Sequence, residues 1–368
     1  MSKELGLSLL RPDYSDSRIP VMEHPNGLSR AAIKHFSGID PLLEPNRIPE
    51  AWRCIAEAFE IDLLWGGGFP GPESETFDWD DGESVKINRS GQKVVQWGVF
   101  YTVVQEDGRH FLDWKKPESP EEALKTQPLD ICPTSTDEYE ALFRAQYKDM
   151  VASTGETCQP IPHHYTTCFH FPLAVFGFEM LCEMGLHEDA FDALMEQFVE
   201  ISVRIATAWS RVPDLKAFIL HDDLTTSAGP IFRPQWYRRH IFPHYPRIFA
   251  PFLNAGIPLI FTSDGNCSAF ADDIFDAGAD GLNFEYLVDL ERLVANHPDK
   301  ILIGNVNSAT IAQGPLDRIE EETRRCISIG SKARRFVMNV GGGLTHDMPV
   351  GNLEAYLKLR KELCRTQR

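Results

Sequence analysis

The stretch Lys216–Asp223, "KAFILHDD", runs four apolar residues directly into a histidine and two aspartates. A short, continuous apolar run is typical of a strand of a parallel sheet, which is buried on both faces. In α/β barrels the chemistry lies at the carboxyl ends of such strands, where loops and strand ends present polar side chains. The stretch therefore predicts a buried strand that delivers titratable groups to a site.

The chain after residue 216 repeats this pattern. Apolar runs alternate with amphipathic stretches, which gives five strand-and-helix units in succession. This alternation predicts a parallel sheet, either a barrel or a doubly wound layer. The five runs are "KAFIL" (216–220), "IPLIFT" (257–262), "GLNFE" (281–285), "ILIGNV" (301–306) and "RRFVMNV" (334–340).

The first half of the chain adds at least two more strands. "AWRCIAEAFEID" (51–62) predicts a helix that leads into the strand "LLW", and "PIPHHYTTC" (160–168) precedes two long helical patterns. Between them, "KVVQWGVFYTVVQEDGRHFLDW" (93–114) carries Asp107-Gly108 between alternating apolar segments, which is a hairpin signal. We expect this hairpin to lie outside the sheet, in an insertion at 66–115 that shapes the rim of a pocket.

Composition limits the classes of partner. The formal charge is -18 and the isoelectric point is about 5.1, so no basic stripe is present to bind nucleic acid or an anionic membrane surface. This charge favours a neutral or cationic ligand. The eight cysteines are scattered without a C-x-x-C pair, as expected for reduced thiols in the cytoplasm. No stretch reaches the roughly 20 apolar residues of a membrane span.

Polar side chains follow the ends of successive predicted strands. Neighbouring residues of a strand face opposite ways, so one member of the pair His163–His164 and one of Asp222–Asp223 should face the site. A carboxylate after a strand also often caps the next helix, which is the structural alternative for each aspartate. The candidates are His163, His164, Tyr165, His221, Asp222, Asp223, Asp264, Glu285, Asn305, Asn339 and His346.

Several of these stretches resemble the uroporphyrinogen decarboxylase superfamily, which includes corrinoid-dependent methyltransferases. The resemblance is carried by "DDLTTSAGPIFRPQWYRRHIFPHYPRIFAPFLNAGIPLIFTSDGN" (222–266), "GADGLNFE" (278–285), "ILIGNVN" (301–307) and "RRFVMNVGGGLTHDMPVGNLEAYL" (334–357). It implies a single (β/α)8 barrel with its site at the carboxyl ends of the strands. We expect the barrel to span residues 45–368, with the hairpin insertion, after an N-terminal extension at 1–44.

Other positions differ from a true decarboxylase. The stretch "PVMEHPNGLSR" (20–30) stands where that branch has an arginine-containing segment. Its aspartate corresponds to Gly66 or Gly67, its tyrosine to Phe178 and its histidine to Gly342. Losing these charged and polar groups removes the recognition that a substrate with eight carboxylates needs. The resemblance therefore implies no uroporphyrinogen decarboxylase activity.

Thiol-methylating members of the superfamily bind zinc through an H-x-C pair and a distant cysteine. The pair corresponds here to Thr262 and Asp264, and the distant cysteine falls in the glycine run. We therefore expect no thiolate-bound zinc. The set His221, Asp264 and Glu285 could hold a divalent ion, but proton transfer is favoured because no two-histidine or thiolate spacing supports a metal.

The resemblance then favours a methyltransferase that passes a methyl group from a small methoxylated or methylated compound to cobalt. The corrinoid would be carried by a small partner protein, and a homodimer is compatible with the sequence. An oxygen leaving group departs more easily when it is protonated, so an acid is required. We predict Asp264, Asp223 and His221 as catalytic residues. The predicted substrate-binding residues are His164, Tyr165, Asp222, Glu285, Asn305 and His346.

Two alternatives remain open at this point. One is cofactor-independent decarboxylation of a smaller acid, which needs an arginine in the pocket, and Arg233 and Arg334 are the available candidates. The other is a non-catalytic protein that binds a corrinoid or another tetrapyrrole. The acids at several strand ends argue against a non-catalytic role.

Overall fold

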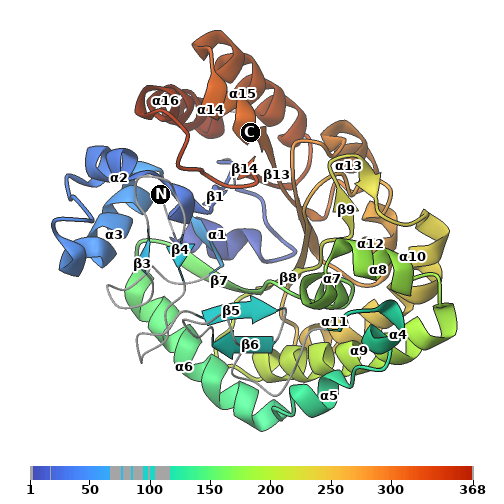
Figure 1. The fold of residues 1–368 in the computed structure, drawn as a ribbon. Helices are drawn as coiled ribbons and strands as arrows, with labels where there is room; N and C mark the ends of the chain where they lie inside the picture. The colour runs from blue at the N-terminus through green and yellow to red at the C-terminus, as the bar shows by residue number, and fades with distance from the viewer. Residues whose placement is uncertain are drawn as a thin grey trace.

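The computed structural model describes residues 3–16, 18–66, 76–77, 84–85, 94–97, 100–103 and 117–366. Eight parallel strands form one sheet whose order follows the chain. A parallel bridge between Val21 and Met338 brings the first strand to the last, so the sheet closes into a single (β/α)8 barrel (Figure 1). The strands are β1 (Met22–Glu23), β2 (Leu63–Gly66), β7 (Gln159–His164), β8 (Phe218–His221), β11 (Leu259–Ser263), β12 (Gly281–Phe284), β13 (Ile301–Asn307) and β14 (Arg335–Gly341).

The five strands predicted after residue 216 are confirmed, as are the two predicted in the first half. Helices surround the strands (Figure 1). The longer helices are α2 (Arg30–Ser37), α3 (Ile48–Ala58), α6 (Thr136–Thr154), α9 (Glu188–Ser210), α11 (Tyr245–Asn254), α15 (Leu316–Gly330) and α16 (Val350–Thr366). The shorter ones are α4 (Pro120–Ala123), α5 (Pro128–Ile131), α7 (His170–Phe176), α8 (Phe178–Met184), α10 (Pro234–His240), α12 (Ala271–Asp276), α13 (Leu290–Asn296) and α14 (Ser308–Gln313), with 3-10 turns at Pro25–Gly27, Pro45–Arg47 and Phe242–His244.

The amino end of the barrel is closed by helix α1 (Lys3–Leu9), which lies among the strands rather than in the outer ring (Figure 1). Leu5 and Leu9 are buried in one hydrophobic cluster with inward-facing strand residues such as Ile219. Arg335, at the start of β14, donates hydrogen bonds to the carbonyls of Leu9 and Leu10 at 3.0 and 2.9 Å. These bonds satisfy carbonyls that the end of the helix leaves without partners.

The segment predicted as an N-terminal extension also contains the first barrel strand. Strand β1 pairs with β2 through Met22 and Leu63, so the barrel begins before residue 45. With only two residues, β1 is too short to carry an apolar period that the sequence could reveal.

The insertion contains an antiparallel pair of strands within the stretch predicted to form a hairpin. Strands β5 (Val94–Trp97) and β6 (Phe100–Val103) are antiparallel, and Trp97 pairs with Phe100. Asp107-Gly108, where the turn of the hairpin was predicted, lies outside the described residues. The insertion also contains the antiparallel pair β3 (Thr76–Phe77) and β4 (Ser84–Val85). A further short hairpin, β9 (Thr225–Thr226) and β10 (Gly229–Pro230), follows β8.

Candidate active site

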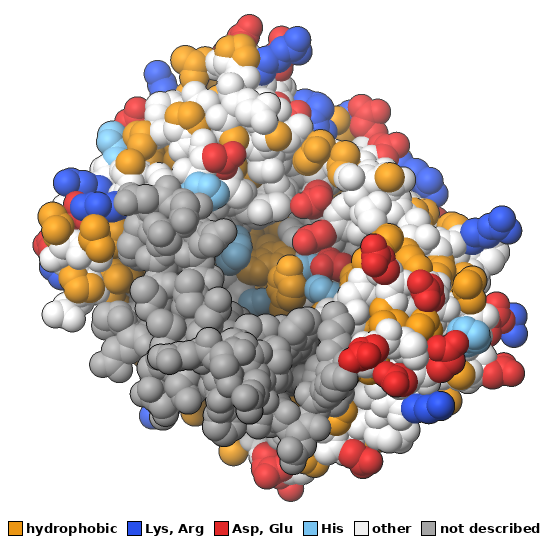
Figure 2. Space-filling model, in the orientation of Figure 1, with side chains coloured by type: hydrophobic (Ala, Val, Ile, Leu, Met, Phe, Trp, Pro, Cys, Tyr) orange, Lys and Arg blue, Asp and Glu red, His pale blue; other side chains and the backbone are white. Residues whose placement is uncertain are grey.

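A cavity of about 270 Å³ opens at the carboxyl ends of the barrel strands. Figure 2 shows this hollow, with histidine and hydrophobic side chains inside it and acidic side chains along one part of its rim. Every barrel strand except β13 contributes to its lining, either directly or through the residues that follow it. The lining residues are His24, Trp65, His163, Tyr165, His221, Ser263, Asp264, Asn283, Phe284, Glu285, Asn339, Gly342 and Gly343.

The centre of the site is built by β8. Ile219 packs in the inner cluster of the barrel, so His221, two residues further on, faces the same way. His221 Nε2 lies 2.8 Å from Asp223 Oδ1 and 3.7 Å from Asp264 Oδ1. Asp223 Oδ1 also accepts a 3.0 Å hydrogen bond from the backbone N–H of Asp264. These contacts hold one imidazole between two carboxylates.

The two carboxylates differ in their protonation behaviour. Burial, reinforced by the nearby negative charge of Asp223, raises the pKa of Asp264 to about 6, although half of this side chain (51%) is exposed. Burial also acts to raise the pKa of Asp223, but the hydrogen bond and charge of His221 outweigh it and hold that pKa below its usual value. Asp264 is therefore the group of the pair that can carry a proton near neutral pH.

The histidine responds in the opposite sense. Burial alone would lower the pKa of His221, but the hydrogen bond to Asp223 and the two carboxylate charges outweigh it, so this pKa is raised. His221 and Asp223 thus favour the charged pair. Asp264 therefore lies beside the charged carboxylate of Asp223, and that negative charge opposes the ionisation of Asp264.

A third carboxylate lies next to Asp264. Glu285 Oε2 accepts a 3.0 Å hydrogen bond from the backbone N–H of Gly265, the residue after Asp264. Gly342 lies next to the other oxygen of Glu285: a Cβ atom built on this glycine would be 3.2 Å from Glu285 Oε1. The glycine therefore leaves open space beside this oxygen, and its φ of +80° is a conformation that other residues rarely adopt.

Aromatic rings form another wall of the cavity, next to His221. Tyr165 packs edge-on against His221 with ring centroids 4.3 Å apart, and Trp65 lies 6.1 Å from His163. Burial lowers the pKa of both His24 and His163 to about 4, so these two rings are neutral at physiological pH. The wall thus offers flat, uncharged surfaces beside the carboxylates.

The sequence pattern of the family described as uroporphyrinogen decarboxylase (URO-D) matches residues 177–363, half of the chain. The chain belongs to the URO-D family. A uroporphyrinogen decarboxylase from Nocardia farcinica is 31% identical over 137 residues, which are 35% of this chain and 38% of that protein. One from Pelobacter propionicus is 24% identical over 180 residues, 48% of this chain and 51% of the relative. The chain thus spans about half, or less, of the length of these curated relatives.

A solved structure extends the comparison over the whole chain. It is described as a methyltransferase from Methanosarcina mazei and matches with a TM-score of 0.63 at 16% identity, covering 98% of each chain. This likeness shows that the two chains share one fold along their whole length, including the part of this chain before residue 177. In the part of the chain described by the structure, no helix is long and apolar enough to cross a membrane.

Asp222, predicted to bind substrate, points away from the cavity of this URO-D barrel. Its buried carboxylate accepts hydrogen bonds from the N–H groups of Phe169 and His170 at 3.0 and 2.5 Å, and from the Tyr245 hydroxyl at 2.7 Å. These donors belong to the start of α7 and to α11. Asp222 therefore ties the turn after β7 to the outer helices, and that prediction was wrong because Asp223, not Asp222, shares the face of His221.

The same alternation separates the histidine pair. His163 lines the cavity, and its Nδ1 lies 2.8 Å from the carbonyl of Gly66. His164 instead lies outside the lining and packs edge-on against Phe171 of α7, with ring centroids 6.0 Å apart. The choice of His164 for substrate binding was therefore wrong. Ile161 belongs to the inner cluster, so counting by two from this residue would have selected His163.

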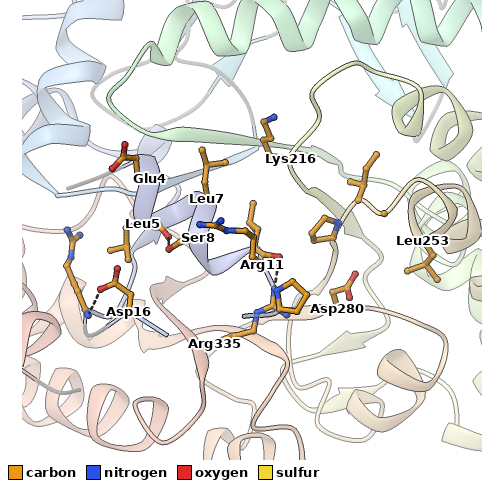
Figure 3. Close-up of a pocket in the computed structure, with 16 residues that line it drawn as sticks. Glu4, Leu5, Leu7, Ser8, Arg11, Asp16, Lys216, Leu253, Asp280 and Arg335 are labelled. Carbon is orange, nitrogen blue, oxygen red and sulfur yellow. Dashed lines mark hydrogen bonds between the residues drawn. The ribbon is translucent and has the colours of Figure 1, made fainter. Parts of the chain in front are cut away.

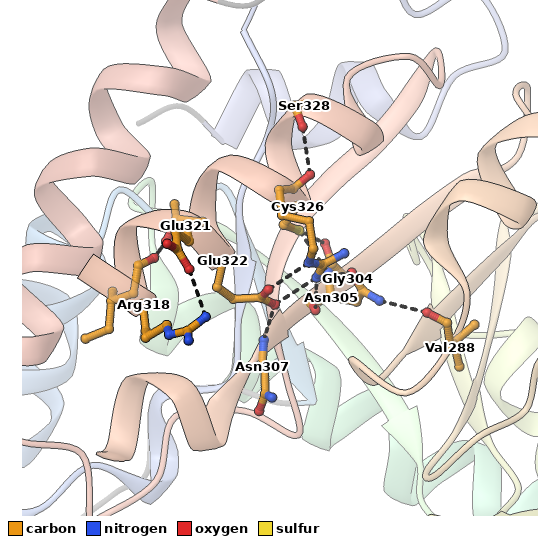
Figure 4. A network of polar contacts seen from close by, with 12 residues as sticks. Val288, Gly304, Asn305, Asn307, Arg318, Glu321, Glu322, Cys326 and Ser328 are labelled. Atoms are coloured by element: carbon orange, nitrogen blue, oxygen red, sulfur yellow. Dashed lines mark hydrogen bonds and ion pairs between the residues drawn. The ribbon is translucent and has the colours of Figure 1, made fainter. Parts of the chain in front are cut away.

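Asn305 and His346 also lie outside the cavity lining. The buried Asn305 side chain donates to the carbonyl of Val288 at 3.0 Å and accepts from Arg325 at 3.1 Å, within the polar network of Figure 4. It anchors the loop after β12 from outside. His346 is an exposed residue of the loop after β14. Tyr165 and Glu285, by contrast, do line the cavity as predicted.

Further residues of the site did not stand out in the sequence. Trp65 lies at the end of β2, and His24 follows the unpredicted strand β1. His170, at the start of α7, places Nδ1 3.3 Å from Asp223 Oδ2, the carboxylate oxygen that does not contact His221. A histidine inside an apolar helix gives no signal of such a contact, because only the folded chain brings α7 against the end of β8.

Three residues of the site could hold a divalent ion. The ligand atoms of His221, Asp223 and Asp264 all lie within 4.8 Å of one another. This set replaces the one considered from the sequence, in which Glu285 stood in place of Asp223. An imidazole and two carboxylates suit ions of hard or intermediate character. Among the described lining residues none is a cysteine, so a thiolate site has no ligand there.

Proposed function

We propose that this URO-D-family chain is a methyltransferase that moves a methyl group from a small methoxylated or methylated compound to the cobalt of a corrinoid protein. The family and the fold support an enzyme with its site at the carboxyl end of the barrel. The observation that carries the proposal is Asp264, a carboxyl group that faces the cavity and has its pKa raised to about 6.

The proposed chemistry needs an acid more than a nucleophile. The reduced corrinoid of the partner is the methyl acceptor, and its cobalt supplies the electron pair of the new carbon–cobalt bond. As the carbon–oxygen bond breaks, its electron pair goes to the oxygen, and Asp264 donates a proton to that oxygen to form the alcohol or phenol. His221 and Asp223 fix the position of Asp264 and return it to the protonated form.

Decarboxylation of a small acid is supported less well. A carboxylate substrate needs a cationic partner, and no Arg or Lys is present among the described lining residues. Of the two candidates, Arg334 lies 3.4 Å from Asp299 at the amino end of β14, and Arg233 precedes α10. Neither contributes to the cavity.

The test is a methyl-transfer assay with free cob(I)alamin at high concentration and a panel of methoxylated arenes, followed by the cobalt absorbance spectrum. We expect methylcobalamin with at least one donor, and roughly 100-fold slower formation by Asp264→Asn, since general acids contribute about this factor. Asp272→Asn is the matched control, because Asp272 is an exposed carboxylate of α12. Release of carbon dioxide from an acid, with no donor giving methylcobalamin, would contradict the proposal.

A further inference from the structure

The cavity carries an excess of negative groups. Asp264 and Glu285 line it, and Asp223 contacts both the His221 ring and the Asp264 backbone beside it. Among the described residues there, His221 is the one group whose raised pKa favours a positive charge. No Lys or Arg in the described lining offsets the rest. A ligand with a carboxylate or phosphate would thus meet like charges, whereas a cation would relieve them.

Glu285 is the carboxylate with a free end. Its Oε2 holds the backbone of Gly265, while Oε1 has no hydrogen-bond partner among the described residues. Gly342 keeps the space beside Oε1 open, since any side chain there would begin 3.2 Å from this atom. An acceptor oxygen with vacant space beside it suits a charged N–H donor from a ligand.

The aromatic wall fits the same kind of ligand. Trp65 and Tyr165 supply electron-rich faces, which attract cations as well as flat rings. The buried rings of His24 and His163 add no positive charge that would repel an ammonium group. A volume of about 270 Å³ lies below the usual range for drug-sized ligands, so one ring with short substituents is the expected size.

We infer that the cavity holds an ammonium subsite at Glu285 Oε1, so that the methyl donor is a small ring compound carrying an amine rather than a carboxylate. That the bound compound is a methyl donor rests on the proposed function, whereas the ammonium subsite itself does not. In this arrangement the methoxyl group lies towards Asp264, the ring lies against Trp65 and Tyr165, and the ammonium group occupies the space beside Gly342.

The subsite can be tested with ligands that have no methyl group to transfer. Calorimetric titration at neutral pH would compare benzylamine, benzyl alcohol and benzoate, which share one ring and differ in charge. We expect benzylamine to bind about 10-fold or more tightly than benzyl alcohol, as a hydrogen bond to a charged group allows, and benzoate to bind most weakly. Glu285→Gln keeps an oxygen for the Gly265 N–H and should abolish the preference.

Glu291→Gln is the matched control, because Glu291 is exposed in the first turn of α13 and lies outside the lining. This variant should keep the wild-type order of affinities. Benzoate binding as tightly as benzylamine, a preference unchanged in Glu285→Gln, or no binding of benzylamine at millimolar concentration would each overturn the subsite. If Glu285→Gln does not fold, the order of the three ligands on the wild-type protein still decides.

The two proposals fail separately. An ammonium preference without methyl transfer from 4-(aminomethyl)-2-methoxyphenol would retain the subsite and reject the methyltransferase. Transfer from the matching 4-carboxylate at an equal rate would retain the methyltransferase and reject the subsite.

Discussion

The two ends of the barrel differ in what their polar groups do. A groove of about 1130 Å³ lies at the amino end beside α1 and is several times larger than the cavity at the carboxyl end (Figure 3). Yet two of the arginines that line it are already bound within the protein: Arg335 holds two carbonyls of the α1 segment, and Arg18 pairs with Asp62 at 2.7 Å. At the carboxyl end, Asp264 and Glu285 each have a carboxylate oxygen that accepts no hydrogen bond from another described residue. Free polar groups, rather than volume, locate the site.

Two neighbouring residues at the carboxyl end, Asp222 and Asp223, differ in the same way. Asp222 is fully bonded inside the fold, and Asp223 is bonded to His221, which lines the cavity. We expect Asp222→Asn to cost about 3 kcal/mol of unfolding free energy, because the amide N–H₂ group would face buried donors. Asp223→Asn should cost about 1 kcal/mol but slow catalysis strongly. Chemical denaturation of both variants checks this, and equal losses of stability would break the comparison.

Helix α1, which closes the amino end of the barrel, should contribute to stability and not to catalysis. Leu9 is completely buried between α1 and the barrel strands. Leu9→Ala should lower the unfolding free energy by about 2 to 4 kcal/mol, the usual cost of such a cavity. At a temperature where the variant stays folded, its KM and kcat should match those of wild type. A selective loss of kcat would show that the two ends are coupled.

The pH dependence of methyl transfer should report Asp264. The proton donor must be protonated, and the pKa of Asp264 is raised to about 6. The rate should therefore be constant below this pKa and fall about tenfold per pH unit above it. Asp264→Asn should show no such fall in the same range. A wild-type rate that rises with pH through this range would mean that the carboxylate acts as a base.

The smallest effect is expected from the groove at the amino end. Arg11 is an exposed residue of its lining. Arg11→Gln should change stability by no more than about 0.5 kcal/mol, as is usual for surface substitutions, and leave methyl transfer unchanged. Melting temperature and initial rate measure both. A marked loss of activity would indicate that the larger groove takes part in function.

Most of the barrel was predictable from the sequence, because buried parallel strands appear as continuous apolar runs. The β8 to β14 part was predictable from these runs alone. The two-residue strand β1 was not, since its place in the sheet depends on pairing with β2 and on the bridge from Val21 to Met338. Such pairing between distant segments leaves no local pattern.

The site was predictable in part. Strand ends indicated His221, Asp264 and Glu285, but not which of two neighbours faces inward. Alternation from Ile161 and Ile219 would have selected His163 and Asp223. The position of His170 in the site could not be predicted, because its contact with Asp223 depends on how α7 packs over the end of the barrel.

The central claim is that the carboxyl end holds a proton donor, and the protonation of Asp264 can be measured without any substrate. Infrared difference spectra of wild type against Asp264→Asn, recorded from about pH 4 to 8, isolate the carboxyl band of this one residue. The account predicts a protonated carboxyl band that disappears with a pKa of about 6 and is missing from the variant. A group already ionised at about pH 5 would contradict it, since the site would then hold no acid to protonate the leaving oxygen.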